Sequence, residues 1–229
     1  LILLVNRNPA VRNTLVRVSA LLMGVLSVAV GVMYFGHPFK IGVDSPLVRF
    51  LMMAVDGLAA LTVLYFCVKY KRYLTALLGL AQFFLIVAFE FHAGSYARSV
   101  WDFNIDNLSI IMILIAGIIG GLIAVYSLGY MAVYHRKHVD VKDRRSFFFF
   151  VVFLFLSAMF GLVMSNNLLY MYTFWEITSL CSFLLIGYSG TNEAIHNSFK
   201  ALWMNLLGGL AFAMACLLYT SPSPRDGAT

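Results

Sequence analysis

The chain has 229 residues, of which 62% are hydrophobic and only 11% are charged, and its formal net charge is +6. Soluble domains average about 45–50% apolar and about 25% charged residues, so this composition excludes that class and predicts a polytopic α-helical membrane protein. Nucleic-acid binding is not needed to explain the positive charge, because nearly all Lys and Arg residues stand in short segments between apolar runs.

Seven apolar runs follow one another along the chain, and each has the length expected of a membrane helix. A polar loop at residues 6–17 precedes the first run. Lys69-Tyr-Lys-Arg72 separates the second run from the third so closely that the two should form a hairpin. The predicted spans are residues 18–35, 50–68, 73–91, 105–126, 147–164 and 168–188, and a seventh that begins near 198.

The end of the chain changes character abruptly. From Cys216 onward the sequence matches, residue for residue, the peptide that a transposase sequencing adapter encodes. We therefore predict that residues 216–229 are an adapter-derived tail and exclude them from fold reasoning. A genuine Ser/Pro-rich loop is the alternative.

The Lys and Arg residues divide unequally between the two sets of alternate loops. The richer set should face the cytoplasm, because cytoplasmic loops of membrane proteins carry an excess of Lys and Arg. The run with Glu176 then crosses from outside to inside. The richer set holds Arg7, Arg12, Arg17, Lys69, Lys71, Arg72, Arg136, Lys137, Lys142, Arg144 and Arg145, and the poorer set holds Lys40, Arg49 and Arg98.

Glu176 is the residue that most needs an explanation, because it lies well inside the apolar run 168–188. Counted from Leu169 at 1.5 Å per residue, it sits roughly 10 Å inside a hydrocarbon core of about 30 Å. A lone ionisable group there costs about 2.5–3.5 kcal/mol. Thr173, Ser179 and Gly187 share roughly one helix face with it, so this face should look into the protein. A carboxylate in such surroundings suits proton loading and release; a static ion pair or hydrogen-bonded glutamate is the alternative.

Four further ionisable residues are candidates for a role in or near the membrane. Lys200 opens the seventh run and is either a proton relay or a lysine that snorkels to the interface. Asp56 and Glu90 lie toward the outer ends of the second and third runs, where they either share a proton or cation or are solvated at helix ends. Asp106 is placed to cap the start of the fourth run.

Neither the cysteines nor the glycines indicate a cofactor. Cys67 and Cys181 lie in apolar runs and no Cys-x-x-Cys pair occurs, so the sequence supports neither an iron–sulfur cluster nor a zinc site. Gly117-Ile-Ile-Gly-Gly121 has the small-xxx-small pattern of packed membrane helices. We expect no redox cofactor and no metal in this chain.

Four segments, in order and spacing, resemble one family of membrane proteins. Trp175-Glu-Ile-Thr-Ser-Leu-Cys-Ser-Phe-Leu-Leu-Ile-Gly-Tyr188 resembles the block W-E-x-x-x-x-x-S-[YF]-L-L-I-G-[FY] of antiporter-like subunits. Such subunits occur in respiratory complex I, in Mrp-type sodium/proton antiporters and in energy-converting hydrogenases. The N-terminal region is most similar to the hydrogenase branch. The other segments are Phe103-Asn-Ile-Asp-Asn-Leu-Ser109, Ser127-Leu-Gly-Tyr-Met131 and Phe199-Lys-Ala-Leu202, and the resemblance covers about residues 101–209.

The resemblance implies a fold of inverted five-helix repeats, of which these residues would form an N-terminal fragment. It also implies that Glu176 pairs with a lysine on a later helix, beyond this chain, and that the pair moves protons. Lys200 matches an earlier basic position with a supporting role. The family commonly has D-G-L-S where this chain has Asp106-Asn-Leu-Ser.

These observations give one prediction for the whole chain: an all-α polytopic membrane protein with about seven transmembrane helices. Residues 1–100 would be N-terminal helices with an additional hairpin, and residues 101–215 the proton-translocating region. The predicted function is proton translocation by a non-redox subunit of a redox-driven complex, of NADH–quinone oxidoreductase or hydrogenase type. Its partners would be other membrane subunits, lipid, and protons or Na⁺, in a prokaryotic inner membrane. The proton-pathway residues would be Glu176 and Lys200, followed by Asp56 and Glu90.

Two other functions stay open at this stage. The first is a subunit of a free-standing Mrp-type Na⁺/H⁺ antiporter, which needs no redox partner. The second is a purely structural, membrane-anchoring subunit. Neighbouring genes would separate the first from the redox-driven complex, and a complete gene without the later lysine would favour the second.

Overall fold

The computed structural model describes residues 9–43, 45–93, 101–138, 141 and 143–220. Within these residues the chain forms seven helices and one two-stranded ribbon, so the predicted all-α membrane class is confirmed. The helices are α1 (Pro9–Tyr34), α2 (Pro46–Lys69), α3 (Tyr73–Ala93), the continuous helix of α4 (Asn107–Leu114), a π-helical turn (Ile115–Ile119) and α5 (Gly120–Lys137), then α6 (Arg145–Met164), α7 (Leu168–Ile186) and α8 (Asn192–Thr220).

Six of the helices in the described part of the chain are long and apolar enough to cross a membrane. They are α1, α2, the α4–α5 helix, α6, α7 and α8. The described apolar part of α3, Tyr73–Leu85, is shorter. The chain is therefore a multi-pass membrane protein.

The backbone of α8 continues to Thr220, past residue 216, where the predicted tail begins. Residues 221–229 lie outside the described residues. The adapter-derived tail and the division at residues 100 and 215 therefore stay predictions.

The polar loop predicted for residues 6–17 is wrong over its described part, because α1 begins at Pro9. Proline favours the first position of a helix, since its fixed φ suits the first turn and its missing N–H is not needed there. This added turn packs against the bundle: Val16 is fully buried, and Arg12 is only 4% exposed. The arginines made this stretch read as a loop, whereas it is a helix that buries Arg12 and exposes Arg17.

The two strands were not predicted either. Strand β1 (Phe39–Ile41) follows α1, and strand β2 (Phe103–Ile105) precedes α4, so the predicted fourth span starts two residues too early at 105. The strands pair antiparallel, with Lys40 opposite Asn104. Three-residue strands leave too short a pattern to recognise in a sequence.

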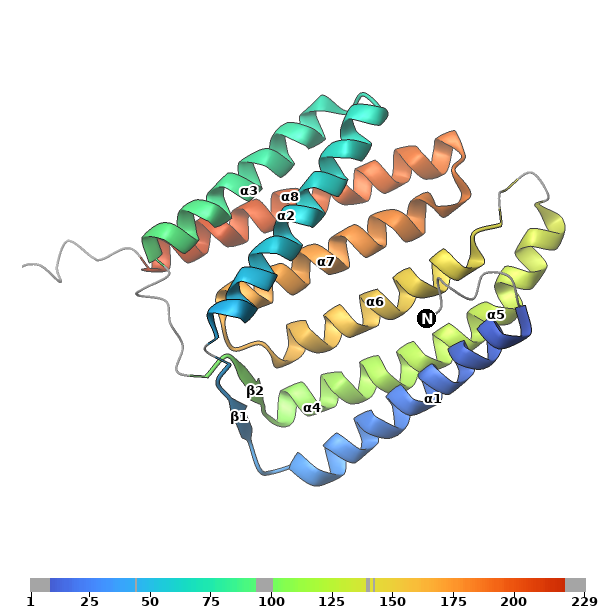
Figure 1. Ribbon diagram of the computed structural model, residues 1–229, viewed down its shortest axis with the longest axis horizontal. Coiled ribbons are helices and arrows are strands. Elements are labelled where there is room, and N and C mark those ends of the chain that lie inside the picture. The colour runs from blue at the N-terminus through green and yellow to red at the C-terminus, as the bar shows by residue number, and fades with distance from the viewer. Residues whose placement is uncertain (1–8, 44, 94–100, 139–140, 142, 221–229) are drawn as a thin grey trace, which may run out of the picture.

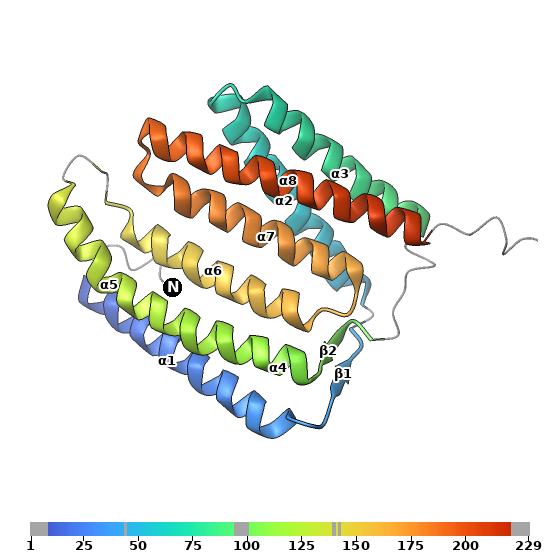
Figure 2. The same ribbon diagram turned by 180° about the vertical axis from the view of Figure 1, so that it is seen from behind.

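The helices lie side by side, and the order in space differs from the order in sequence (Figure 1). α1 packs against the α4–α5 helix, α6 packs against α7, and α7 against α8. The hairpin of α2 and α3 lies at the opposite side from α1, where α2 packs on α7 and α3 packs on α8 (Figure 2). The α2–α3 hairpin lies between β1 and β2 in the chain. Because β1 and β2 pair with each other, the hairpin is an insertion between two paired strands.

Asp102 anchors the start of α7 to this ribbon. It is only 7% exposed, and its two oxygens accept hydrogen bonds from the Val43 N–H at 2.8 Å and from Asn167 Nδ2 at 2.9 Å. Asn167 in turn caps α7, because its Oδ1 accepts from the Leu169 N–H at 3.0 Å. The ribbon therefore fixes the start of α7, the helix that carries Glu176.

Asp106 caps α4, as predicted: its Oδ1 accepts from the Ser109 N–H at 2.7 Å. This hydrogen bond holds the pKa of the Asp106 carboxyl below its usual value. We expect Asp106→Ala to lower the free energy of unfolding by about 1 kcal/mol. Because folding lowers the pKa of this carboxyl, ionised Asp106 stabilises the folded protein at pH values above its unfolded pKa of roughly 3.9. The difference in unfolding free energy between wild type and Asp106→Ala should therefore shrink below that pH. Unfolding in detergent at two pH values measures both effects, and Asp106→Asn, which keeps an acceptor, is the matched control.

Three segments rich in Lys and Arg meet at one end of the bundle, which we call the basic end (Figure 1). They are the start of α1 with Arg12 and Arg17, the turn between α2 and α3 with Lys69, Lys71 and Arg72, and the connection from α5 to α6 with Arg136, Lys137, Arg144 and Arg145. There, Arg145 donates to both oxygens of Asp143, at 2.9 Å from Nε and 2.6 Å from Nη2. This pairing lowers the pKa of Asp143 to about 2. Arg144 Nη2 donates to the Tyr188 carbonyl at 3.1 Å, and His135 Nε2 lies 2.9 Å from the Tyr188 hydroxyl. The loop before α6 therefore holds the end of α7.

Candidate functional site

Glu176 lies near the middle of α7, and its helix face looks into the protein. Thr173 is fully buried, and Ser179 lines a cavity together with Glu176. One turn from the basic end, Gly187 faces Ser198 of α8. The face of small and polar residues expected from the sequence therefore packs against other helices.

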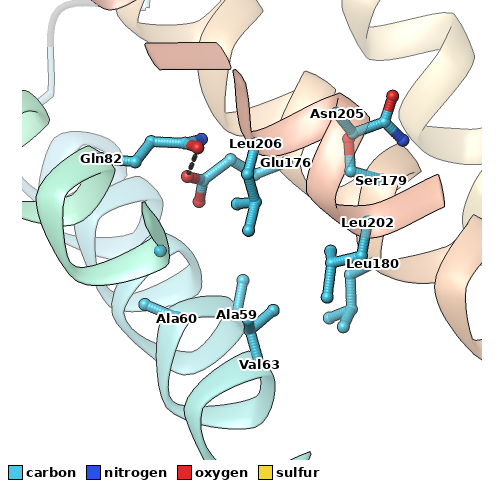
Figure 3. A pocket seen from close by; sticks show the side chains of 11 residues that line it. Ala59, Ala60, Val63, Gln82, Glu176, Ser179, Leu180, Leu202, Asn205 and Leu206 are labelled. Carbon is cyan, nitrogen blue, oxygen red and sulfur yellow. Dashed lines mark hydrogen bonds between the residues drawn. The ribbon is translucent and has the colours of Figure 1, made fainter. Parts of the chain in front are cut away.

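Two side chains donate hydrogen bonds to one oxygen of Glu176. The Tyr172 hydroxyl, one turn earlier on α7, donates to Oε1 at 2.7 Å. Gln82 Nε2, on α3 of the inserted hairpin, donates to the same oxygen at 3.0 Å (Figure 3). Both donors are buried, with Tyr172 1% and Gln82 2% exposed. Burial of a carboxylate favours its neutral form, whereas hydrogen bonds to the charged form favour that form, so the two effects oppose each other at Glu176.

Asp56 of α2 extends this polar cluster. It is 4% exposed, and its Oδ2 lies 2.9 Å from the Thr173 hydroxyl on α7. Tyr172 interacts electrostatically with both Asp56 and Glu176. Asp56 thus faces the helix of Glu176. Whether it shares a proton or cation with Glu90, as the sequence suggested, stays a prediction: the Glu90 backbone belongs to α3, but its side chain lies outside the described residues.

A cavity of about 30 Å³ adjoins Glu176 (Figure 3). It lies among α2, α3, α7 and α8, so the inserted hairpin forms much of its wall. Its polar residues are Gln82, Glu176, Ser179 and Asn205, and its apolar residues are Ala59, Ala60, Val63, Gly79, Leu180, Leu202 and Leu206. The carboxylate therefore has a small, partly polar space beside it rather than lipid.

Lys200 does not join this cluster. It is exposed, and it stands on α8 nine residues before Gly209, the α8 residue that adjoins Gln82. At 1.5 Å per residue this is about 14 Å along the helix. Its place at the basic end suits a lysine that snorkels to the interface, and its part in a proton pathway remains a prediction.

Sequence reasoning missed Gln82, Tyr172 and Asn205. Gln82 did carry a signal, because it is a lone amide in an otherwise apolar run. Tyr172 stands four residues before Glu176, the spacing at which helix side chains meet. What no local pattern shows is that the α2–α3 hairpin brings Gln82 to Glu176, since the two residues are 94 positions apart in the chain.

The residue types that commonly bind metals are dispersed in the part of the chain that the structure describes. No three His, Cys, Asp or Glu side chains gather there in a way that would hold a metal ion. Cys67 and Cys181 are buried free thiols.

Comparison with protein families gives two matches, one over the α4–α5 helix and one over α7 and α8, with α6 outside both. Residues 91–140 match the family described as NADH-ubiquinone oxidoreductase (complex I), chain 5 N-terminus. Residues 165–223, which include α7 with Glu176, match the family described as NADH:quinone oxidoreductase/Mrp antiporter, TM. Over these two regions the chain is similar to the antiporter-like subunits of complex I and Mrp. Asp56 and Gln82 precede both regions.

Curated antiporter-like relatives include Na⁺/H⁺ antiporter subunit A1 from Staphylococcus aureus strains bovine RF122 / ET3-1, JH9 and Newman. Each is 32% identical over 124 residues, which are 54% of this chain but only 14% of the relative. The chain thus spans a small part of the length of these relatives. No solved structure matches. The predicted antiporter-like family is supported, whereas none of these relatives is a hydrogenase subunit.

Proposed function

We propose that this chain is part of an antiporter-like subunit that moves protons across the membrane, with Glu176 as the group that takes up and releases them. The observation that carries the proposal is a carboxylate in the middle of a membrane helix with two buried donors and a cavity beside it. Intramembrane ionisable residues mark ion and proton pathways.

We further propose that the proton movement is exchange for a cation, as in a Mrp-type Na⁺/H⁺ antiporter. The names of the relatives from Staphylococcus aureus support this alternative better than the redox-driven complex that we first predicted. Its partners would be the other membrane subunits of a multisubunit antiporter. The basic end would face the cytoplasm of a prokaryotic cell, in accord with the excess of Lys and Arg there.

A redox-driven complex remains the second candidate, because the first family match carries the description of a complex I chain. In that case electron transfer in partner subunits would drive Glu176, and this chain would hold no redox cofactor itself. The two candidates differ in what must be supplied to move protons.

Everted membrane vesicles that contain the complete subunit and its partners separate the two. We expect that adding Na⁺ to vesicles with an acidic interior collapses the pH gradient without any electron donor, because exchange needs only the two ion gradients. Vesicles from cells that lack the gene are the control. Proton movement that requires an electron donor and ignores Na⁺ would instead favour the redox-driven complex.

A further inference from the structure

Gln82 is a buried side chain of which only the amide nitrogen has a hydrogen-bond partner inside the described part of the chain. Its Nε2 donates to Glu176 at 3.0 Å, whereas its Oε1 is buried and accepts no hydrogen bond from any described residue. With Glu176 ionised, the amide nitrogen must face the carboxylate, since the amide oxygen would repel it. A buried acceptor without a partner is penalised for its lost hydration. The side chain therefore calls for a further partner.

The cavity beside Glu176 can hold that partner. Its volume is about 30 Å³, and a cavity needs only about 10–15 Å³ to hold a water molecule if two to four polar groups surround it. Gln82, Glu176, Ser179 and Asn205 line this cavity. A water molecule there meets both requirements, of space and of polar partners.

We propose that this cavity is a water site that exchanges protons with Glu176, and that Gln82 is the positioning residue of both. The inference rests on the proposed function, and it gives the inserted α2–α3 hairpin a part in transport. Gln82 Nε2 holds the ionised carboxylate, and Gln82 Oε1 accepts from the water. Ser179 of α7 is a further partner of the water, whereas the Asn205 amide of α8 points away from Glu176 (Figure 3).

The proton step is balanced without any further reactant. A proton that reaches the water makes it a hydronium ion. One O–H bond of the hydronium breaks as an O–H bond forms at a carboxylate oxygen of Glu176, and a neutral water remains. Release is the reverse. Ser179 and Leu180 follow Glu176 along α7, so the cavity extends from the carboxylate toward the basic end.

The charged and titratable groups around Glu176 set how its proton uptake responds to pH. In the described residues these are Tyr172 on its own helix and Asp56 of α2, while Gln82 of α3 and Asn205 of α8 are neutral. Asp56 acts in the same way in wild type and in variants at position 82. A change at Gln82 alone therefore reports on Gln82.

Gly209 of α8 gives the Gln82 amide its room. A Cβ atom at Gly209 would lie 2.7 Å from Gln82 Nε2, whereas one at Gly208 would lie 4.0 Å from Trp175 Cζ2. Gly209→Ala thus crowds the Gln82 amide, whereas Gly208→Ala, at the adjacent position, does not contact it. This pair of variants tests Gln82 without changing it.

The test is the pH dependence of cation-driven proton transport by the complete subunit in its assembly, in everted vesicles. We expect Gln82→Leu to move the midpoint upward by about one pH unit, because the ionised carboxylate loses a charge-assisted donor. Gly209→Ala should move it in the same direction, and Gly208→Ala should leave it at the wild-type value. An unchanged midpoint in Gln82→Leu overturns the positioning role; if Gln82→Leu does not accumulate in the membrane, equal midpoints for the two glycine variants overturn it.

The water site has its own readout. Ser179→Ala should slow transport severalfold without moving the midpoint, and Ser179→Thr, which keeps a hydroxyl, should keep much of the rate. A wild-type rate in Ser179→Ala overturns the water site. These outcomes are distinct from a failure of the proposed function, because Glu176→Gln with full transport would refute that function whatever Gln82 does.

Discussion

Replacing Glu176 by glutamine should reduce proton transport at least tenfold, while the subunit still enters the membrane and assembles. Glutamine has nearly the same shape and can still accept from Tyr172 and Gln82, so both hydrogen bonds of this side chain are kept. It cannot bind or release a proton near neutral pH, so the proposed carrier is lost. Transport in everted vesicles, normalised to the amount of assembled subunit, measures the effect.

Glu193→Gln is the matched control for this prediction. Glu193 is exposed in the first turn of α8, and the substitution removes the same charge without touching the polar cluster. We expect its transport to stay close to wild type. If Glu176→Gln transports as well as Glu193→Gln, the proton passes elsewhere and the proposed role of Glu176 is refuted.

The second large effect is expected where α1 meets the long α4–α5 helix. A Cβ atom at Gly121 would lie 3.0 Å from the backbone oxygen of Ala20, and one at Gly117 would clash with Ser27. Backbone atoms cannot turn aside as a side chain can, so Gly121→Leu must push α1 away. Overpacking of this kind costs about 1–3 kcal/mol, and we expect the upper part of that range. The small-xxx-small pattern of the sequence is thus a helix contact.

Gly129→Leu provides the comparison, because it lies on the same helix and a Cβ there meets nothing within 4 Å. In thermal unfolding of both variants in the same detergent, we expect the melting temperature to fall clearly for Gly121→Leu and to change little for Gly129→Leu. Equal melting temperatures would mean that α1 does not depend on this close approach.

The sequence predicted most of the helices, because twenty-residue apolar runs leave few other structures in a membrane. It also predicted that the face of Glu176 looks inward, and that Asp106 caps a helix, since both depend on neighbours in the chain. The start of α1 at Pro9 was missed, because three arginines made this stretch read as a loop.

The partners of Glu176 could not be predicted, because they depend on where the α2–α3 hairpin packs. Gln82 and Glu176 are 94 residues apart, and their contact follows from the insertion of the hairpin between β1 and β2. Strands of three residues give no usable sequence pattern. The ribbon of β1 and β2, between which the hairpin is inserted, could therefore not be predicted. Lys200 is a different case: its matching sequence position suggested a supporting place in the pathway, and the structure places it exposed on α8, so its role stays a prediction.

Infrared difference spectroscopy, between a pH below and a pH above the midpoint of transport, tests most directly whether Glu176 carries the proton. The complete wild-type assembly should show the C=O band of a protonated carboxyl group at the lower pH, shifted in D₂O and replaced by carboxylate bands at the higher pH. Glu176→Gln should lack this band, while Glu193→Gln keeps it. The same band in Glu176→Gln would contradict the account, because the proton would then reside on another carboxyl group.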